Sequence, residues 1–264
     1  MTQTSPPPTM SADSSAAPMT VALVAAVRDE LMPTIHRLGL KPDAPWYVGQ
    51  RSGKRIVAAF TGVGSRRAIE VFNTMLDEHR PSLVIHAGFA GGLDPALRVA
   101  SIVVVDWVID SQGQTYRLNG HIPTATPTAI ASGATGGPGD ASYRPAATTL
   151  LTMDHLVHST TEKEALFRQH RAAVVDMETV HLARVAQQRG LAMKMVRAVS
   201  DPAGMSIPQE AVRWVNADGS HNLPAAVWHL VTRPWKIATT MQLGRNVKLA
   251  GANLAQRIEA LLSE

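Results

Sequence analysis

The chain has 264 residues, of which 45% are hydrophobic and 17% are charged, a balance typical of a globular protein with a sizeable core. It contains no cysteine, which excludes disulfides, thiolate nucleophiles and cysteine-bound metal. The formal net charge of +4 is compatible with phosphate-bearing ligands, anionic lipid or nucleic acid. A nucleic-acid partner is disfavoured, because the sequence has neither an aromatic-studded strand nor a concentrated basic helix face.

The first 19 residues are rich in Pro, Ser, Thr and Ala and show no hydrophobic periodicity. Ordering them would cost backbone entropy without burying much apolar surface, so we expect a disordered leader over residues 1–19. They lack the charged start and the apolar stretch of a secretory signal, and no later segment has the roughly 20 apolar residues of a membrane span. We therefore expect a cytoplasmic protein with one catalytic domain over residues 20–264.

Short runs rich in Val, Ile and Ala predict buried strands at Val21–Val27, Arg55–Thr61, Ser82–Ala87, Ser101–Val105, Thr149–Met153 and Met193–Val199. Helical patterns lie between several of them, at Ser65–His79 and Met177–Arg189. Gly190 should end the second helix in the left-handed conformation. Strands that alternate with helices predict an α/β domain with a largely parallel sheet.

Residues 121–147 string together Pro, Thr, Ala, Gly and Ser and predict a mobile loop, either a functional lid or an insertion. Beyond Asp201 the pattern predicts helices at 208–216, 223–231 and 234–262. The tail at 223–262 mixes basic residues with apolar ones and with tryptophans. Such a helix can rest on a membrane surface, but packing of its apolar side on the sheet is the commoner arrangement.

Three acidic residues stand where strands hand over to loops or helices: Glu30 follows the first strand, Glu178 opens a helix, and Asp201 ends a strand. In open α/β sheets, ligands collect at the carboxyl ends of the strands, so these carboxyl groups are candidate site residues. Each also has an ordinary explanation. Glu30 and Glu178 could be helix-start residues stabilised by the helix dipole, and Asp201 before Pro202 could form a turn.

Two glycine-rich turns also follow strands, Thr61–Gly64 and Gly88–Leu93, and their N–H groups could hold phosphate or the polar edge of a ligand. The first turn has Arg67 where a dinucleotide fingerprint needs a third glycine, and the chain has no P-loop and no nucleophile elbow. His155 and His158 lie three residues apart, but without cysteine or an acidic partner set a metal site is disfavoured, and we expect neither metal nor cofactor.

Five motifs in this order resemble the family of nucleoside phosphorylases and methylthioadenosine/adenosylhomocysteine nucleosidases. They are Ala-Val-Arg-Asp-Glu at 26–30, Thr-Gly-Val-Gly at 61–64, Ala-Gly-Phe-Ala-Gly-Gly-Leu at 87–93, Val-Asp-Met-Glu at 175–178 and Arg-Ala-Val-Ser-Asp at 197–201. The resemblance implies a three-layer fold with a central mixed, largely parallel sheet flanked by helices. Within the family, the stretch Leu150–Glu178 and the basic tail around Trp235 are most similar to the hopanoid-associated phosphorylases, which are taken to remove adenine from adenosylhopane.

The resemblance implies that Asp201 protonates the purine N7 and that Glu178 grips the ribose hydroxyls, its helix-start position helping to keep it ionised. Glu30 would orient or deprotonate the attacking water in a hydrolytic enzyme. In a phosphorolytic enzyme, phosphate would be the co-substrate, positioned by backbone N–H groups and an arginine.

The same resemblance supplies further candidates. Substrate contacts are expected from Met177, Gly91, Phe89, Leu156, Val157 and Ser200, and phosphate contacts from Gly62, Gly64, Arg28, Arg66 and Arg67. Phe89 stands where nucleosidases carry a small hydroxyl residue, so that polar contact is lost. We expect cleavage of the N-glycosidic bond of an adenine nucleoside by a homo-oligomer, with phosphorolysis of adenosylhopane favoured. The alternatives are hydrolysis of methylthioadenosine, adenosylhomocysteine or futalosine-like nucleosides, and a non-catalytic binding module.

Overall fold

The computed structural model describes residues 18–118, 148–208 and 237–264. Its strands are β1 (Thr20–Ala25), β2 (Lys41–Asp43), β3 (Trp46–Arg51), β4 (Lys54–Phe60), β5 (Leu83–Gly92), β6 (Ile102–Val105), β7 (Trp107–Ile109), β8 (Thr115–Arg117), β9 (Thr149–Thr152), β10 (Val174–Asp176) and β11 (Ala192–Asp201). Its helices are α1 (Arg28–Leu38), α2 (Ser65–His79), α3 (Thr160–His170), α4 (Thr179–Gln188) and α6 (Ile237–Ser263).

The centre of the sheet is parallel, in the order β4-β1-β5-β11. Side chains on both faces of these strands are buried; the five residues Val21–Ala25 of β1, for example, are all fully inaccessible. A strand buried on both faces needs a continuous apolar run, which is why these segments could be predicted from the sequence. Because the strands run the same way, the carboxyl ends of β1, β5 and β11 meet at one edge of the sheet.

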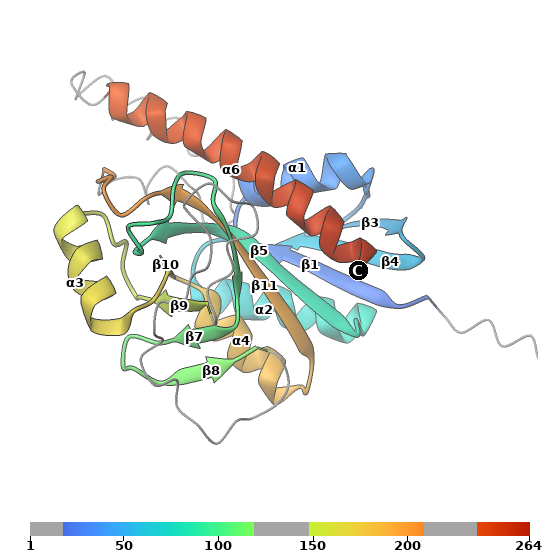
Figure 1. Cartoon of the computed structure of the whole chain (residues 1–264). Coiled ribbons are helices and arrows are strands. Elements are labelled where there is room, and N and C mark those ends of the chain that lie inside the picture. The colour runs from blue at the N-terminus through green and yellow to red at the C-terminus, as the bar shows by residue number, and fades with distance from the viewer. Residues whose placement is uncertain (1–17, 119–147, 209–236) are drawn as a thin grey trace, which may run out of the picture.

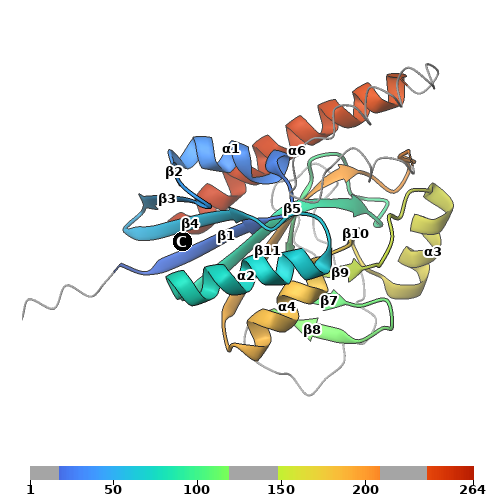
Figure 2. The same ribbon diagram turned by 180° about the vertical axis from the view of Figure 1, so that it is seen from behind.

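Helices cover both faces of this sheet, as Figures 1 and 2 show from opposite sides. Helices α1 and α6 pack against each other and against one face, around a core that includes Leu31, Ile35 and Ile258. Helices α2 and α4 cover the other face, where Phe72 and Leu182 are fully buried. The predicted three-layer fold with a mixed sheet and flanking helices is confirmed.

The remaining described strands extend the sheet mainly through antiparallel pairs. Strands β2 and β3 add to β4, and β8 adds to β7. On β5, strand β10 pairs in the antiparallel sense through Val174 with Gly92 and Val175 with Gly91. This pairing places the segment after β10 beside the carboxyl end of β5.

Most predicted elements are confirmed, with some differences. Helix α2 has the predicted bounds, and Gly190 adopts a positive φ of 64° after α4. The helix predicted from Met177 is shorter, because the residues before it extend as β10 and Glu178 is its N-terminal cap. Helices α1 and α3 and the short strands β2, β3, β7, β8 and β10 were not predicted.

The structure describes the C-terminal helix from Ile237 onward, within the predicted span 234–262, and this part buries Leu254 and Ile258 against α1 and the sheet. The ordinary packing of its apolar side is therefore confirmed for this part of the tail, while Met241 and Leu249 remain exposed. In the ranges that the structure describes, no helix is long and apolar enough to cross a membrane. The predicted leader up to residue 17, the loop at 121–147 and the helices predicted at 209–231 lie outside the described residues.

Candidate functional site

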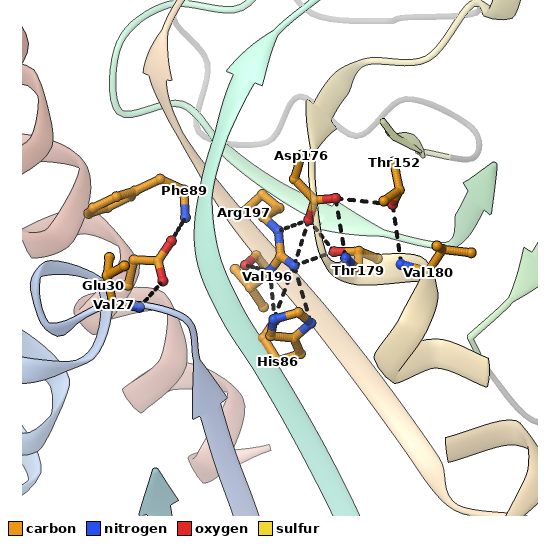
Figure 3. Close-up of polar contacts among 10 residues, drawn as sticks. All are labelled: Val27, Glu30, His86, Phe89, Thr152, Asp176, Thr179, Val180, Val196 and Arg197. Atoms are coloured by element: carbon orange, nitrogen blue, oxygen red, sulfur yellow. Dashed lines mark hydrogen bonds and ion pairs between the residues drawn. The ribbon is translucent and has the colours of Figure 1, made fainter. Parts of the chain in front are cut away.

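Glu30 lies in the first turn of α1, directly after β1, with only 6% of its surface exposed. Its Oε1 accepts a hydrogen bond from the backbone N of Phe89 at 2.7 Å, and its Oε2 accepts one from the backbone N of Val27 at 3.0 Å (Figure 3). Burial raises the pKa of this carboxyl and outweighs the lowering by these N–H groups and by the Arg197 charge. A carboxylate with a raised pKa is a stronger base than an exposed one.

The glycine at position 88 gives Glu30 its room. A Cβ at Gly88 would lie 3.0 Å from Oε1 of Glu30 and 3.4 Å from Nη1 of Arg197. Any larger residue there would push against the carboxyl that Phe89 and Val27 hold. The glycine motif, predicted as a turn, is instead the last half of β5, and it admits an acidic side chain from α1, a role that the sequence pattern alone does not reveal.

Glu178 is the N-terminal cap of α4. The protein around its carboxyl removes most of its solvation, and together with the negative charges of Asp176 and Glu30 this raises its pKa to about 8. Arg197 and the backbone N–H of Gly64 act in the opposite direction but are weaker. The expectation that the helix start keeps Glu178 ionised is wrong for the free protein, because desolvation and two neighbouring carboxyl groups outweigh the helix dipole.

Beneath these carboxyl groups, Arg197 of β11 forms a buried network with only 2% of its surface exposed. Its Nη2 lies 3.1 Å from Oδ2 of Asp176, and its Nη1 donates to the backbone O of His86 at 3.1 Å (Figure 3). The hydroxyls of Thr152 and Thr179 also donate to Asp176. Burial, with the Arg197 charge, lowers the pKa of His86 well below its usual value, so His86 is neutral.

The network balances its one cation with one carboxylate. Sequence reasoning included Asp176 and Arg197 in the motifs but gave them no role. The residue that could have indicated this network is Arg197, because a charged residue within a predicted apolar strand needs a buried partner of opposite charge.

Asp201 ends β11 and is 4% exposed. Its Oδ2 lies 2.6 Å from Nζ of Lys163, a lysine of α3 with no exposed surface, and its Oδ1 accepts the hydroxyl of Ser200 at 2.5 Å. Gly91 of β5 leaves room for this carboxyl, because a Cβ there would lie 3.2 Å from Oδ2. Lys163 was missed as a site residue, since it lies in a polar helical stretch.

Strand β5 brings the three predicted acids to one edge of the sheet. A Cβ at Gly88 would meet the Glu30 carboxyl and one at Gly91 would meet the Asp201 carboxyl, while Gly91 pairs with Val175 of the strand that leads to Glu178. Glu30 and Glu178 are close enough for the charge of one to raise the pKa of the other. The sequence-based expectation that carboxyl groups from distant segments gather at the carboxyl ends of strands agrees with this geometry.

Of the predicted phosphate-binding residues, Gly64 lies beside Glu178, and Arg28 and Arg66 have contacts of their own. Gly62 and Gly64 precede α2 with positive φ, and Gly64 donates its N–H to Glu178. Arg66 is exposed and lies 3.5 Å from Glu70, while the exposed Arg67 follows it in the same helical turn. The guanidinium of Arg28 stacks 5.3 Å from the centre of the Phe60 ring. Phosphate binding by these residues stays a prediction.

The predicted substrate contacts divide into two groups. Val157 is 4% exposed and packs in a core cluster with Leu151 and Leu166, the ordinary role of an apolar residue. Leu156, Met177 and Ser200 are half-buried, Met177 directly beside Glu178 and Ser200 beside Asp201.

Phe89 gives its backbone N–H to Glu30, while its ring points away from the Arg197 network (Figure 3). The ring reaches toward α6, where its Cζ would lie 3.7 Å from a Cβ at Gly251. Phe89 is therefore anchored in the core between the sheet and α6. In the described part of the chain, no group of three or more His, Asp or Glu side chains is arranged to hold a metal ion.

Residues 19–232 match the family described as the Phosphorylase superfamily. The chain belongs to this superfamily. It is 29% identical over 175 residues to the 5'-methylthioadenosine/S-adenosylhomocysteine nucleosidase of Marinomonas sp. (strain MWYL1), covering 62% of this chain and 75% of the relative. It is 25% identical over 209 residues to the nucleosidase of the same name from Listeria monocytogenes serotype 4a (strain HCC23), covering 70% of this chain and 87% of the relative.

Solved structures agree on the fold. The 5'-methylthioadenosine/S-adenosylhomocysteine nucleosidase of Helicobacter pylori, crystallised with butyl-thio-DADMe-Immucillin-A, aligns with a TM-score of 0.64 and 16% identity over 92% of this chain and 97% of its own. Futalosine hydrolase of the same organism aligns with a TM-score of 0.64 and 17% identity over the same shares. The chain is thus an enzyme of the nucleoside phosphorylase and nucleosidase superfamily, which acts on the N-glycosidic bonds of nucleosides.

The raised pKa of Glu178 predicts a pH-dependent stability. The pKa of Glu178 is about 8 in the folded protein and has the ordinary value of 4.5 in the unfolded chain. Between pH 4.5 and about pH 8, Glu178 is therefore protonated in the folded protein and ionised in the unfolded chain. The contribution of Glu178 to the free energy of unfolding is complete below about pH 4.5 and falls by a few kcal/mol as the pH rises to about 8. Glu178→Gln, which cannot ionise, should unfold several degrees higher than the unsubstituted protein at pH 9 and at nearly the same temperature at pH 5.

Thermal unfolding followed by circular dichroism at both pH values measures this difference. Glu70→Gln is the matched control, because the Glu70 side chain is 67% exposed and its replacement should leave the pH dependence unchanged. Equal pH dependence in Glu178→Gln and the unsubstituted protein would contradict the raised pKa.

Proposed function

We propose that this enzyme hydrolyses the N-glycosidic bond of an adenine nucleoside, with water as the nucleophile. The observation that carries the proposal is Glu30, a buried carboxyl with a raised pKa at the carboxyl end of the central strands, coupled to Glu178 and on the same sheet edge as Asp201. Support also comes from the relatives, which are named as methylthioadenosine and adenosylhomocysteine nucleosidases. An adenosine with a thioether at its 5' carbon is the substrate class that we favour.

Each carboxyl then has a separate task. Asp201 gives a proton to N7 of the base, so that the bond between C1' and N9 breaks with its electron pair on a neutral leaving group. Glu178, protonated up to a pH of about 8, can both donate to and accept from the ribose hydroxyls. Glu30 takes a proton from water as the water oxygen bonds to C1'.

Electrostatics favour water over phosphate at this position. The guanidinium of Arg197 is already paired with Asp176, and its charge also acts on the carboxyl groups of Glu30 and Glu178. A phosphate dianion placed here would meet the Glu30 carboxylate, which must be ionised to act as a base, and would need an unpaired cation. Phe89 also offers no hydroxyl to a phosphate oxygen. Water needs only a base, which Glu30 supplies.

Phosphorolysis of adenosylhopane remains the second candidate, favoured by the sequence likeness of residues 150–178 to the hopanoid-associated enzymes. Release of free adenine should be measured from adenosine, methylthioadenosine, adenosylhomocysteine and adenosylhopane, with and without phosphate, and release of hypoxanthine from futalosine. We expect base release that does not depend on phosphate and is fastest with a 5'-thioether.

A rate that requires phosphate would overturn the hydrolytic assignment and support phosphorolysis. Adenine bound without release from any of these nucleosides would instead support a non-catalytic binding module. The Arg168→Met variant is the control and should release the base at the rate of the unsubstituted enzyme. The Arg168 side chain on α3 is 73% exposed and, among the described ion pairs, contacts only Glu164.

A further inference from the structure

The buried lysine of α3 has an unusual set of contacts. Nζ of Lys163 donates to Oδ2 of Asp201 at 2.6 Å and to the backbone O of Asp201 at 3.1 Å. It also donates to the backbone O of Pro202 at 3.1 Å and of Met205 at 2.9 Å. An ammonium has three protons, so the four oxygens more than satisfy it, and Lys163 is held as a cation without access to solvent.

These contacts fix the orientation of the Asp201 carboxyl. Lys163 of α3 holds Oδ2 by an ion pair. Gly91 of β5 lies on the other side of this oxygen, where its lack of a side chain leaves room for the carboxyl. Among the described residues, Oδ1 accepts a hydrogen bond only from the hydroxyl of Ser200, a rotatable group that can turn aside. Of the two oxygens, Oδ1 is thus the one that a ligand can engage by displacing a hydroxyl rather than a buried charge.

We propose that Lys163 is the positioning residue of the general acid, an inference that rests on the proposed function. Lys163 holds Oδ2 so that the other oxygen faces N7 of the base. Because Asp201 is the ion-pair partner of this ammonium in the free protein, Oδ1 takes up a proton from solvent as the nucleoside binds. When Oδ1 has given that proton to N7, the ammonium at 2.6 Å stabilises the carboxylate that remains. The ammonium keeps its own protons throughout, and the electron pair of the broken bond leaves with the base.

A purely structural role is the competing explanation, since Lys163 also ties residues 201–205 to α3. The two explanations predict different rates for a substrate whose leaving group needs no proton: loss of a positioning role should slow only the nucleoside, whereas loss of a structural role should slow both substrates. The test therefore compares Lys163→Met with the unsubstituted enzyme on methylthioadenosine and on 4-nitrophenyl ribofuranoside, whose phenolate leaves unprotonated. Thermal unfolding verifies that each variant is folded, and Arg168→Met on the same helix is the matched control.

We expect Lys163→Met to lower kcat on the nucleoside by about 10- to 100-fold, the equivalent of one charge-assisted hydrogen bond, with KM changed less than about threefold. On the phenyl riboside the loss should be less than about threefold. The double variant Lys163→Met/Asp201→Asn should be no slower on the nucleoside than Asp201→Asn alone, because Lys163 acts through that carboxyl.

Equal losses on both substrates, or losses that multiply in the double variant, would overturn the positioning role. If the enzyme does not cleave the phenyl riboside, the double variant decides by itself. A failure of the proposed function is distinguishable, because it would appear as an absence of base release by the unsubstituted enzyme.

Discussion

Asp201→Asn is expected to lower kcat for adenine release by about two to four orders of magnitude, the usual contribution of a general acid. The Asn side chain has the same shape but has no proton of comparable acidity to give to N7. Its amide can still hydrogen bond to the base, so KM should change much less than kcat. Steady-state rates on methylthioadenosine, measured by adenine release, provide the values.

Stability must be measured beside the rates, because this substitution removes the negative partner of a fully buried ammonium. An unpaired buried charge can cost about 3–5 kcal/mol, so the single variant should unfold at a lower temperature. The double variant with Lys163→Met removes both charges and should recover part of that stability while remaining slow. A folded Asp201→Asn enzyme with an unchanged rate would return Asp201 to the role of a turn residue before Pro202.

The elements that sequence reasoning predicted are those with strong local signals. Strands β1 and β4 are buried on both faces and therefore contain continuous apolar runs, and β11 has a similar run that Lys194 and Arg197 interrupt. Helix α2 shows one apolar side through Phe72 and Met75 and begins after a glycine turn, so its bounds were predicted correctly. Glu30 and Asp201 were found because each stands where a strand signal ends, and Glu178 because it stands where a helix signal begins.

The elements that were missed have weaker local signals. Strand β10 has three residues and is separated from the helix cap Glu178 only by Met177, so its pattern merged with that of α4. Strand β2 is exposed along its length, and its position depends on pairing with β3 rather than on its own composition. Such short strands are fixed by their neighbours, which a single sequence does not show.

The partners of the candidate acids depend on long-range geometry. Lys163 and Asp201 are 38 residues apart, and Arg197 contacts His86 from 111 residues away. The change in Glu178 from an expected carboxylate to a protonated acid follows from the same cause, because its burial and the approach of Glu30 arise only in the folded chain. Residue types at strand ends could indicate where a site lies, but the charge state of its members required the packing.

Glu30→Gln is expected to lower the rate of hydrolysis by about two to four orders of magnitude, because no base would remain to take a proton from water. The raised pKa of Glu30 also predicts that the rate of the unsubstituted enzyme falls, as pH decreases, at a pH above the ordinary carboxyl value of 4.5. Gln can accept from Phe89 but presents an amide NH₂ toward the N–H of Val27, so a stability loss of about 1–3 kcal/mol should accompany it.

The same variant decides between the two nucleophiles. Phosphate is already anionic and needs positioning rather than a base, so a phosphorolytic enzyme would keep most of its phosphate-dependent rate in Glu30→Gln. Rates should therefore be measured with and without phosphate, with Glu70→Gln as the matched control on the exposed side of α2. We expect the rate of base release to fall both with and without phosphate, while binding of adenine is retained. The reason is that two backbone N–H groups hold Glu30 on the sheet edge that also bears Asp201. Preservation of the phosphate-dependent rate would show that Glu30 supports the fold and that the nucleophile is phosphate.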